Sequence, residues 1–398
     1  MDLQKTERNN PVKILLYLSG FYLFVLVVLM ILKTNTDICE WWSRNIARAH
    51  IWLFGNLTKI IGVSFFELFV LVAIPVLVFA LVVAIISLIK KRNREGIQII
   101  LFLACFVLSF VVTYTATAGF AYNRAKMPLV LYEEEISKEE VFEIAEKYVN
   151  KLNDLAIKQK KDERGVIISP YTTKELYQLL EQEYELLNDL DCDDYFNEFI
   201  PRAKSSIFSS LMTETHIVGM FFAPTAEAHI NTSSPSHNTA TTMAHEIAHG
   251  KGVMREDEAN LLAYYIALSS KDDYILFSGM YTLLNQILSA VSYYPNATPE
   301  YAKLMDLISD DVTITSAASS SFWAEHTLLK DVEEFFNDLY LKSNGVENGT
   351  ESYGDSSKAD VVVDDEKLDD YGAPTVEIVD FSDAQKLIFL MAERGVFE

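Results

Sequence analysis

The chain has 398 residues, half of them hydrophobic, and a formal net charge of −23 at pH 7. The charge is unevenly divided: residues 1–122 carry 11 Lys and Arg against 6 Asp and Glu, and the remaining residues carry 22 against 50. Nucleic-acid binding rests on Lys and Arg that neutralise phosphates, so this acidic excess argues against a nucleic-acid partner. The three cysteines are too few and too scattered to indicate a disulfide framework.

Three apolar stretches near the N-terminus are long enough to cross about 30 Å of hydrocarbon as helices. They cover residues 14–32, 68–89 and roughly 97–122, and none contains a charged residue. The first is longer than the apolar region of a secretory signal and lacks a small-residue cleavage site after it, so we interpret it as a retained anchor. Residues 1–122 are therefore predicted to form a multi-pass domain in the lipid bilayer of the cell membrane.

The loops around these spans predict how the chain is oriented. Residues 38–67 mix tryptophans with scattered cations, which is typical of an amphipathic helix in the headgroup region. Lys and Arg gather in the N-terminal tail and in the short link at residues 90–94. Because positively charged short loops stay in the cytoplasm, we expect a cytoplasmic N-terminus and, after three spans, an extracytoplasmic domain at residues 123–398.

The acidic second part has the pattern of a soluble domain. Ser137 precedes Glu140 by three residues, a capping-box arrangement, and apolar residues follow at helical spacing, so a helix is predicted there. Another helix is predicted at residues 174–187. The predicted fold class is α+β, mostly helical.

Two further segments of this domain have distinct compositions. Residues 217–232 combine β-branched and aromatic residues with Pro224, which is typical of an edge strand rather than a central one. Residues 344–371 are rich in Gly, Ser and Asp, so we expect part of this segment to be a mobile surface loop.

The segment TTMAHEIAHG, residues 241–250, contains candidate metal ligands and a candidate catalytic base. His245 and His249 are four residues apart, so on a helix they project from one face and can bind one metal ion. Catalytic zinc takes three protein ligands and leaves a position for water, whose pKa the metal lowers. Glu246, beside the first ligand, is placed to act as general base. Gly250 and Gly252 predict a helix stop and a sharp turn.

The third ligand is expected from the helix that follows the turn. Glu256, Asp257 and Glu258 are the candidates, and we favour Glu256 because small residues on its face allow the two helices to approach closely. Glu258 shares its face with larger apolar residues. Asn260 is expected to hydrogen-bond a ligand histidine.

HEIAH followed by EDEAN, residues 256–260, resembles the Glu-zincin metallopeptidases. That resemblance covers only about residues 221–267 and implies a zincin-like soluble domain with bound Zn²⁺ and a peptide or protein substrate. The three spans, GMFFAPTAEAHIN and LYLKSNGVENGTESYG are together similar to an uncharacterised bacterial membrane family, the domain of unknown function numbered 3810. This second resemblance extends over nearly the whole chain and implies a metallopeptidase-like site without naming a substrate.

Other residues have more than one interpretation. Transition-state stabilisation needs a hydrogen-bond donor, and His326, Tyr340 and Tyr353 are candidates. The edge strand either pairs with an extended substrate or has no special role. Glu227 is a candidate for binding a substrate amine or a structural cation. His229 and His237 are expected to be ordinary, partly buried histidines.

We therefore expect a membrane-anchored zinc metallopeptidase with His245, His249 and Glu256 as metal ligands and Glu246 as catalytic base. The alternative is a non-catalytic receptor or assembly factor that retains zinc for structure, a site that would need ligands but no base. An intramembrane protease is less compatible with the sequence, because the motif lies more than 120 residues beyond the last span.

Overall fold

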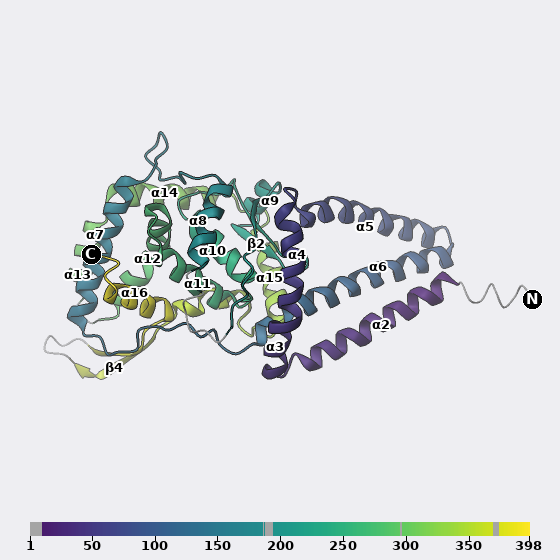
Figure 1. Ribbon diagram of the computed structural model, residues 1–398, viewed down its shortest axis with the longest axis horizontal. Coiled ribbons are helices and arrows are strands. Elements are labelled where there is room, and N and C mark those ends of the chain that lie inside the picture. The colour runs from purple at the N-terminus through teal and green to yellow at the C-terminus, as the bar shows by residue number, and fades with distance from the viewer. Residues whose placement is uncertain (1–9, 186, 188–193, 295–296, 369–373) are drawn as a thin grey trace, which may run out of the picture. The chain divides into compact units, whose positions relative to one another are not determined.

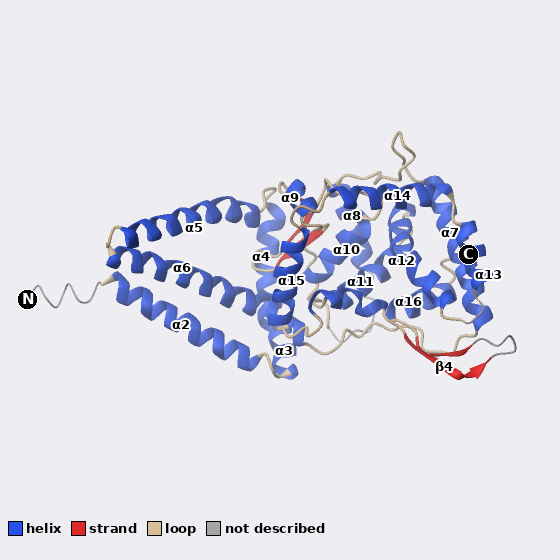
Figure 2. Cartoon of the chain, turned by 180° about the vertical axis from the view of Figure 1, so that it is seen from behind, coloured by secondary structure: helices blue, strands red, loops and turns tan. Residues whose placement is uncertain are grey.

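A computed structural model describes residues 10–185, 187, 194–294, 297–368 and 374–398. The protein is mostly helical, with 69% helix and few strands, as predicted (Figures 1 and 2). Its internal contacts define two compact units. The first comprises Met1–Lys126 together with Phe222–Glu227, and the second comprises Met127–Phe221 and Ala228–Glu398.

The first unit contains the apolar helices. Its helices are α2 (Pro11–Leu32), α3 (Thr36–Trp42), η1 (Ser43–Ala47), α4 (Arg48–Ile60), α5 (Phe65–Ile89), α6 (Asn93–Tyr114), η2 (Thr115–Gly119) and η3 (Ala121–Asn123). Helix α6 contacts both α2 and α5. The segment between the first two apolar helices is helical, as its composition predicts.

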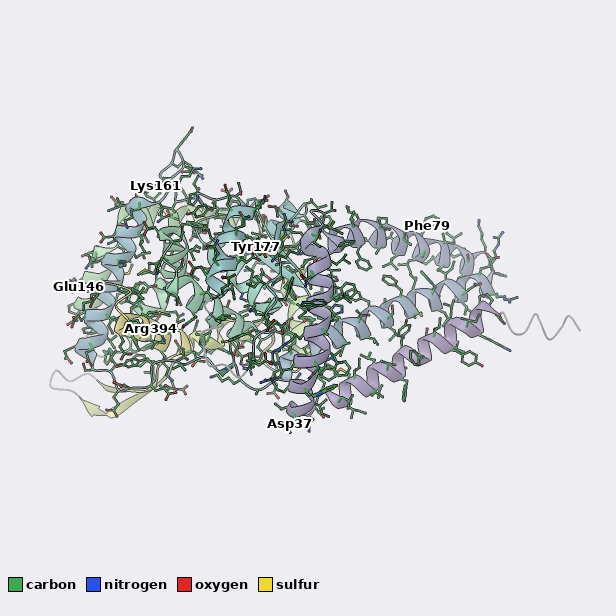
Figure 3. All side chains as sticks on the ribbon, viewed as in Figure 1. Asp37, Phe79, Glu146, Lys161, Tyr177 and Arg394 are labelled. Carbon is green, nitrogen blue, oxygen red and sulfur yellow. The ribbon has the colours of Figure 1, made fainter. Side chains whose placement is uncertain are left out.

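Four helices of the described chain are long and apolar enough to cross a membrane. In three of them, α2, α5 and the helix Asn93–Asn123, only 6% of the most apolar window is buried. Phe79 of α5 is 71% exposed and illustrates these uncovered side chains (Figure 3). The fourth, α12 (Asp273–Ser292), belongs to the second unit, where 61% of its window is buried. Length and composition therefore do not separate α12 from the others, whereas burial does.

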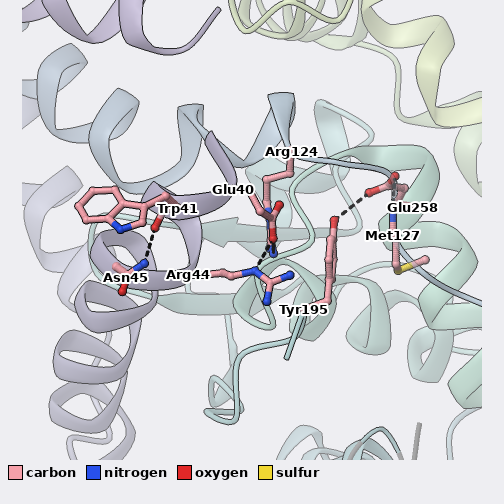
Figure 4. Close-up of polar contacts among 8 residues, drawn as sticks. All are labelled: Glu40, Trp41, Arg44, Asn45, Arg124, Met127, Tyr195 and Glu258. Carbon is pink, nitrogen blue, oxygen red and sulfur yellow. Dashed lines mark hydrogen bonds and ion pairs between the residues drawn. The ribbon is translucent and has the colours of Figure 1, made fainter. Parts of the chain in front are cut away.

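Helix α3 is held to the segment that follows α6 by polar and aromatic contacts. The indole N–H of Trp42 donates to the Ala116 carbonyl at 2.8 Å, and its ring stacks on Phe120 at 4.4 Å. Glu40 accepts two hydrogen bonds from Arg124, at 3.0 and 2.8 Å, and one from Arg44 at 2.6 Å (Figure 4). Burial of Glu40 opposes its ionisation, but these hydrogen bonds outweigh burial and lower its pKa to about 2.

The second unit is a bundle of helices. They are α7 (Lys138–Lys158), α8 (Thr173–Glu185), α9 (Ser209–Glu214), α10 (Thr239–Gly250), α11 (Glu256–Ser269), α12, α13 (Thr298–Leu307), α14 (Asp310–Glu325), α15 (Lys330–Ser343), η5 (Gly349–Ser357) and α16 (Asp383–Glu393). Helices α10, α11 and α12 contact one another, and α7 and α16 pack on α12. The predicted capping box starts α7, with Ser137 and Glu140 bonded in both directions.

Two small sheets complete the second unit. Strands β1 (Ala203–Ser205), β2 (Gly219–Phe222) and β3 (Glu227–Ile230) form one sheet in the order β1-β3-β2, with β1 parallel to β3. Strands β4 (Asp360–Leu368) and β5 (Pro374–Asp380) form an antiparallel pair. The single edge strand predicted within residues 217–232 is corrected: the segment forms two strands, β2 at the edge and β3 in the centre of the sheet, and Pro224 lies in the turn between them, where its missing N–H is not needed for pairing.

The segment predicted to contain a mobile loop, residues 344–371, has more regular structure than its composition indicates, and its mobility stays a prediction. The described part of that segment forms η5 and β4. Helix η5 packs on α11 and α15, and β4 gains its hydrogen-bonding partner from β5, so tertiary contacts override the loop-like composition. Residues 369–371 lie outside the described residues.

Candidate metal centre

The turn after α10 brings the next helix back alongside it. Gly252 has φ +94°, and its N–H donates to the His249 carbonyl at 3.0 Å, while the Val253 N–H donates to the Ala248 carbonyl at 3.2 Å. This left-handed closure is a glycine-dependent helix stop. At Gly250 a side chain would collide with Pro201, so glycine also permits a close approach there. The predicted helix stop and turn are present.

The two predicted histidines and Glu256 converge across this turn. Oε2 of Glu256 lies 3.2 Å from Nε2 of His245 and 3.5 Å from Nε2 of His249. One donor atom from each residue lies within 4.8 Å of the other two. The side chains of His249 and Glu256 are only 9% and 7% exposed, so the cluster is shielded from water.

The hydrogen bonding of these side chains fits a metal ion. Nδ1 of His249 donates to the Val253 carbonyl at 2.8 Å, so Nε2 is the nitrogen that faces Glu256 and can bind a metal once its proton is displaced. Oε2 of Glu256 and Nδ1 of His245 are buried and make no hydrogen bond within the described part of the chain. A buried carboxylate oxygen without a hydrogen bond is costly, and a cation between the three residues would compensate it.

His249 and Glu256 each stabilise the charged form of the other. Burial alone would lower the pKa of His249 and raise that of Glu256. The opposite charge outweighs burial in each case, so the pKa of His249 rises to about 9 and that of Glu256 falls to about 2. The Glu256 carboxylate is therefore ionised at neutral pH, which is the form that binds a cation.

Glu246 lies on α10 next to the first ligand and is also buried. Gly219 of β2 packs against it, since a Cβ at Gly219 would lie 2.5 Å from Oε1 of Glu246. Burial raises the pKa of Glu246, the two histidines oppose that change and Glu256 adds to it. A carboxylate with a raised pKa beside a metal cluster is a stronger proton acceptor than an exposed one.

Comparison with known proteins identifies the family. A family model described as a protein of unknown function, DUF3810, matches residues 42–358, which include all the residues of this cluster. The chain belongs to the DUF3810 family. No curated protein and no solved structure matches the chain.

Tyr353 is the candidate oxyanion donor whose pKa is affected by the acidic residues of the cluster. Burial raises its pKa well above the usual value, and the charges of Glu256 and Glu246 raise it further. Nδ2 of Asn337 donates to this hydroxyl at 3.4 Å. His326, by contrast, uses Nδ1 to donate to the Phe322 carbonyl, within its own helix. The third candidate, Tyr340, lies on α15.

Asn260 does not have the role predicted for it. Its Nδ2 donates to the Tyr353 carbonyl at 3.0 Å, not to a ligand histidine. The reason is local, because the tight turn brings the Val253 carbonyl to His249 first. Asn260 thus holds η5, the segment that carries Tyr353, to the helix that carries Glu256.

Glu258, a candidate third ligand, and Glu227, a candidate for binding an amine or a cation, both make other contacts. Glu258 accepts from the Met127 N–H at 3.0 Å and from the Tyr195 hydroxyl at 3.5 Å (Figure 4), so it secures the start of the second unit. Glu227 was a candidate for a substrate amine or a cation, but its carboxylate accepts from the backbone N–H groups at the start of α5. No motif in the sequence signals this contact, whose partners are more than 160 residues apart.

His229 and His237 are both buried and neither belongs to the metal-ligand cluster found among the described residues. Burial lowers the pKa of His237 to about 4, so it is neutral at ordinary pH, and its ring packs edge-on against Tyr281.

Proposed function

We propose that this DUF3810 protein is a membrane-anchored zinc metallopeptidase. His245, His249 and Glu256 hold the zinc ion, and Glu246 is the general base. The convergence of donor atoms from His245, His249 and Glu256, the last two of them buried, beside the buried Glu246 is the observation that carries the proposal. A purely structural zinc site needs ligands but no adjacent base, so this arrangement favours catalysis.

Each residue has a defined task in this mechanism. When bound, zinc would polarise the peptide carbonyl and the attacking water. Glu246 accepts the proton of that water and passes it to the leaving amine. The Tyr353 hydroxyl donates a hydrogen bond to the negative charge that develops on the carbonyl oxygen. Strand β2, an edge strand beside Glu246, offers its main chain to an extended peptide.

We further propose that three helices, α2, α5 and α6, cross the membrane, with a cytoplasmic N-terminus and the site outside the cytoplasm. Exposed apolar side chains on these helices support the number of spans. Lys and Arg in the turn between α5 and α6 support the orientation. The metal cluster lies on α10 and α11, in the second unit, which does not favour an intramembrane protease.

A non-catalytic receptor or assembly factor with structural zinc is the second candidate function. It is compatible with the same three residues, because a structural zinc site needs only ligands. The two candidates share the metal ligands and differ in whether Glu246 is needed for a reaction.

Substitution of Glu246 tests the proposal. The full chain in lipid nanodiscs is assayed for zinc content and for cleavage of a peptide library, as wild type, Glu246→Gln and His245→Ala. Glu246→Gln preserves volume and all three ligands, so we expect zinc to stay bound while cleavage falls about 10²–10⁴-fold, the usual contribution of a general base. His245→Ala should lose zinc and activity together.

The outcomes separate the two functions. Undiminished cleavage by zinc-loaded Glu246→Gln would show that Glu246 is not the base. A zinc-loaded wild type that cleaves no peptide would favour the non-catalytic candidate.

A further inference from the structure

The backbone of Tyr353, the proposed oxyanion donor, is held by the helix that carries a proposed metal ligand. Nδ2 of Asn260 donates to the Tyr353 carbonyl at 3.0 Å. Asn260 follows Glu256 by four residues on α11, so both side chains project from the same face of that helix. Helix η5, which contains Tyr353, packs on α11, α15 and α16. One helix therefore positions both the ligand and the segment that carries the donor.

The start of η5 is fixed to α15. Gly349 has φ +56°, and a Cβ at this position would collide with the Asp338 carboxylate. Oδ1 of Asp338 accepts from the Thr350 N–H at 3.3 Å, and Lys342 pairs with the same carboxylate at 2.8 Å. Glycine thus allows η5 to approach α15 closely, which brings Tyr353 within reach of side chains on α15.

Asn337 of α15 contacts the hydroxyl of Tyr353. Its Nδ2 donates to the hydroxyl oxygen at 3.4 Å. Asn337 also hydrogen-bonds the carboxylate of Glu333, one turn earlier on the same face of α15. A carboxylate accepts hydrogen bonds and donates none, so the amide nitrogen of Asn337 must face Glu333, which fixes the orientation of the amide. One N–H of the amide is then bonded to Glu333, and the other is available to Tyr353.

A hydroxyl that accepts a hydrogen bond keeps its own proton for another partner. Asn337 presents a donor to the Tyr353 oxygen, so the tyrosine proton is not used in this contact. Tyr353 retains that proton at neutral pH, because burial raises its pKa and the charges of Glu256 and Glu246 raise it further. The bond of 3.4 Å is long, as hydrogen bonds of catalytic groups commonly are before a substrate binds. The free proton is what an oxyanion donor requires.

We propose that Asn337 is a positioning residue whose amide, oriented by Glu333, donates to the Tyr353 hydroxyl and directs the tyrosine proton to the oxyanion that develops on the substrate. The inference rests on the proposed function, in which Tyr353 is the oxyanion donor. Such a donor is effective only when it is oriented before the reaction begins. Asn260 holds the backbone of Tyr353, and Asn337 determines where its proton points.

Asn337→Asp reverses the hydrogen bond at nearly constant volume. A carboxylate at position 337 only accepts, so the Tyr353 hydroxyl donates to it and is withdrawn from the substrate. In the full chain in nanodiscs we expect kcat for the best library peptide to fall about 10–10³-fold, as for loss of the donor itself, with little change in KM. Zinc content should not change, since no ligand is touched. Asn337→Leu leaves the tyrosine proton free, so kcat should fall only about tenfold or less.

A double-mutant cycle with Tyr353→Phe separates positioning from a general structural role. If Asn337 acts through the tyrosine hydroxyl, Asn337→Asp should have little further effect on kcat once that hydroxyl is removed. A residue that only stabilises the fold would lower kcat equally in both backgrounds. Asn337→Leu carries the same cycle if Asn337→Asp does not fold.

Fluorine NMR reads the contact without any reaction. With 3-fluorotyrosine placed at position 353 of the full chain, we expect the resonance to move by more than its linewidth in Asn337→Asp and in Asn337→Leu. Asn348→Ala is the matched control, because it removes an amide bond of the same segment, from Asn348 to Asp355 at 3.5 Å. In this variant the resonance and kcat should match those of wild type.

Three outcomes would overturn the inference. They are an unmoved resonance in both Asn337 variants, undiminished kcat in Asn337→Asp, and an equal loss of kcat by Asn337→Asp with and without the Tyr353 hydroxyl. A resonance that moves in a protein whose zinc-loaded wild type cleaves no peptide supports the bond between Asn337 and Tyr353 and overturns the proposed function alone.

Discussion

The orientation of His249, one of the proposed zinc ligands, is set by its own turn. Gly252 adopts a left-handed conformation, the chain reverses, and the Val253 carbonyl accepts the proton of Nδ1. The remaining nitrogen, Nε2, faces Glu256. Because this bond is local, the ring orientation does not depend on distant segments. Tyr353 differs, since its position depends on Asn260 and on the packing of η5.

Tyr353→Phe removes the proposed oxyanion donor while keeping the ring. We expect kcat to fall about 10–10³-fold with little change in zinc content, because loss of one such donor costs roughly this much. The effect should appear in kcat more than in KM, since the hydrogen bond forms fully only in the transition state. Tyr340→Phe is the matched control and should behave like wild type. Equal losses in the two variants would show that the effect is structural.

An ion cluster adds to the Trp42 contacts that join helix α3 to the segment after α6. Arg124 contacts Glu40 through two nitrogens, and its side chain is only 2% exposed, so the pair is shielded on one side. Paired Arg and carboxylate groups of this geometry are stronger than exposed ion pairs. The attachment of α3 to Arg124, which follows η3, therefore depends on the charge of Glu40.

The depressed pKa of Glu40 predicts a dependence of stability on pH. Its pKa is about 2 in the folded protein against 4.5 ordinarily, so its contribution is complete above about 4.5 and is lost as the pH falls towards about 2. We expect wild type to melt at a higher temperature than Glu40→Gln near neutral pH, and the difference to shrink below about pH 4.5.

Melting curves of the two proteins in nanodiscs measure this difference. Glu95→Gln is the control, because its partner Arg92 and Glu95 itself are both about 60% exposed and such surface pairs contribute little. A difference between wild type and Glu40→Gln that stays constant with pH would contradict the assignment.

At the scale of the whole molecule, charge and hydrophobicity are separated along the chain. The apolar helices are in the first unit, and most of the acidic residues follow them. Helices α5 and α6 are joined by a short cationic turn, so α5 begins on the side where α6 ends.

Reporter fusions test the orientation. Alkaline phosphatase, which folds only outside the cytoplasm, should be active when fused after Lys126 and inactive when fused at Arg92, because the cationic turn stays inside. A reporter that is active only in the cytoplasm should give the opposite pattern. Phosphatase activity at Arg92 but not after Lys126 would reverse the proposed topology.

The sequence by itself determined the features that depend on neighbouring residues. Uninterrupted apolar length predicted the helices that can cross a membrane, because helical hydrogen bonding is satisfied within the segment. Capping residues predicted the start of α7, and glycine predicted the end of α10. The four-residue spacing of the histidines and the small-residue face beside Glu256 predicted which residues meet in the candidate metal cluster. This was possible because α10 and α11 are adjacent in the chain.

Only the tertiary structure decided the features that depend on distant partners. Apolar length alone does not distinguish α12 from the other three candidate spans, and only the tertiary structure shows that 61% of its apolar window is buried against 6% in the others. Glu227, Glu258 and Asn260 are polar side chains whose roles follow from which backbone groups they meet, and those groups are 93 to 162 residues away. Periodicity and capping act over a few residues, whereas the partner of a buried carboxylate is set by how the whole chain packs.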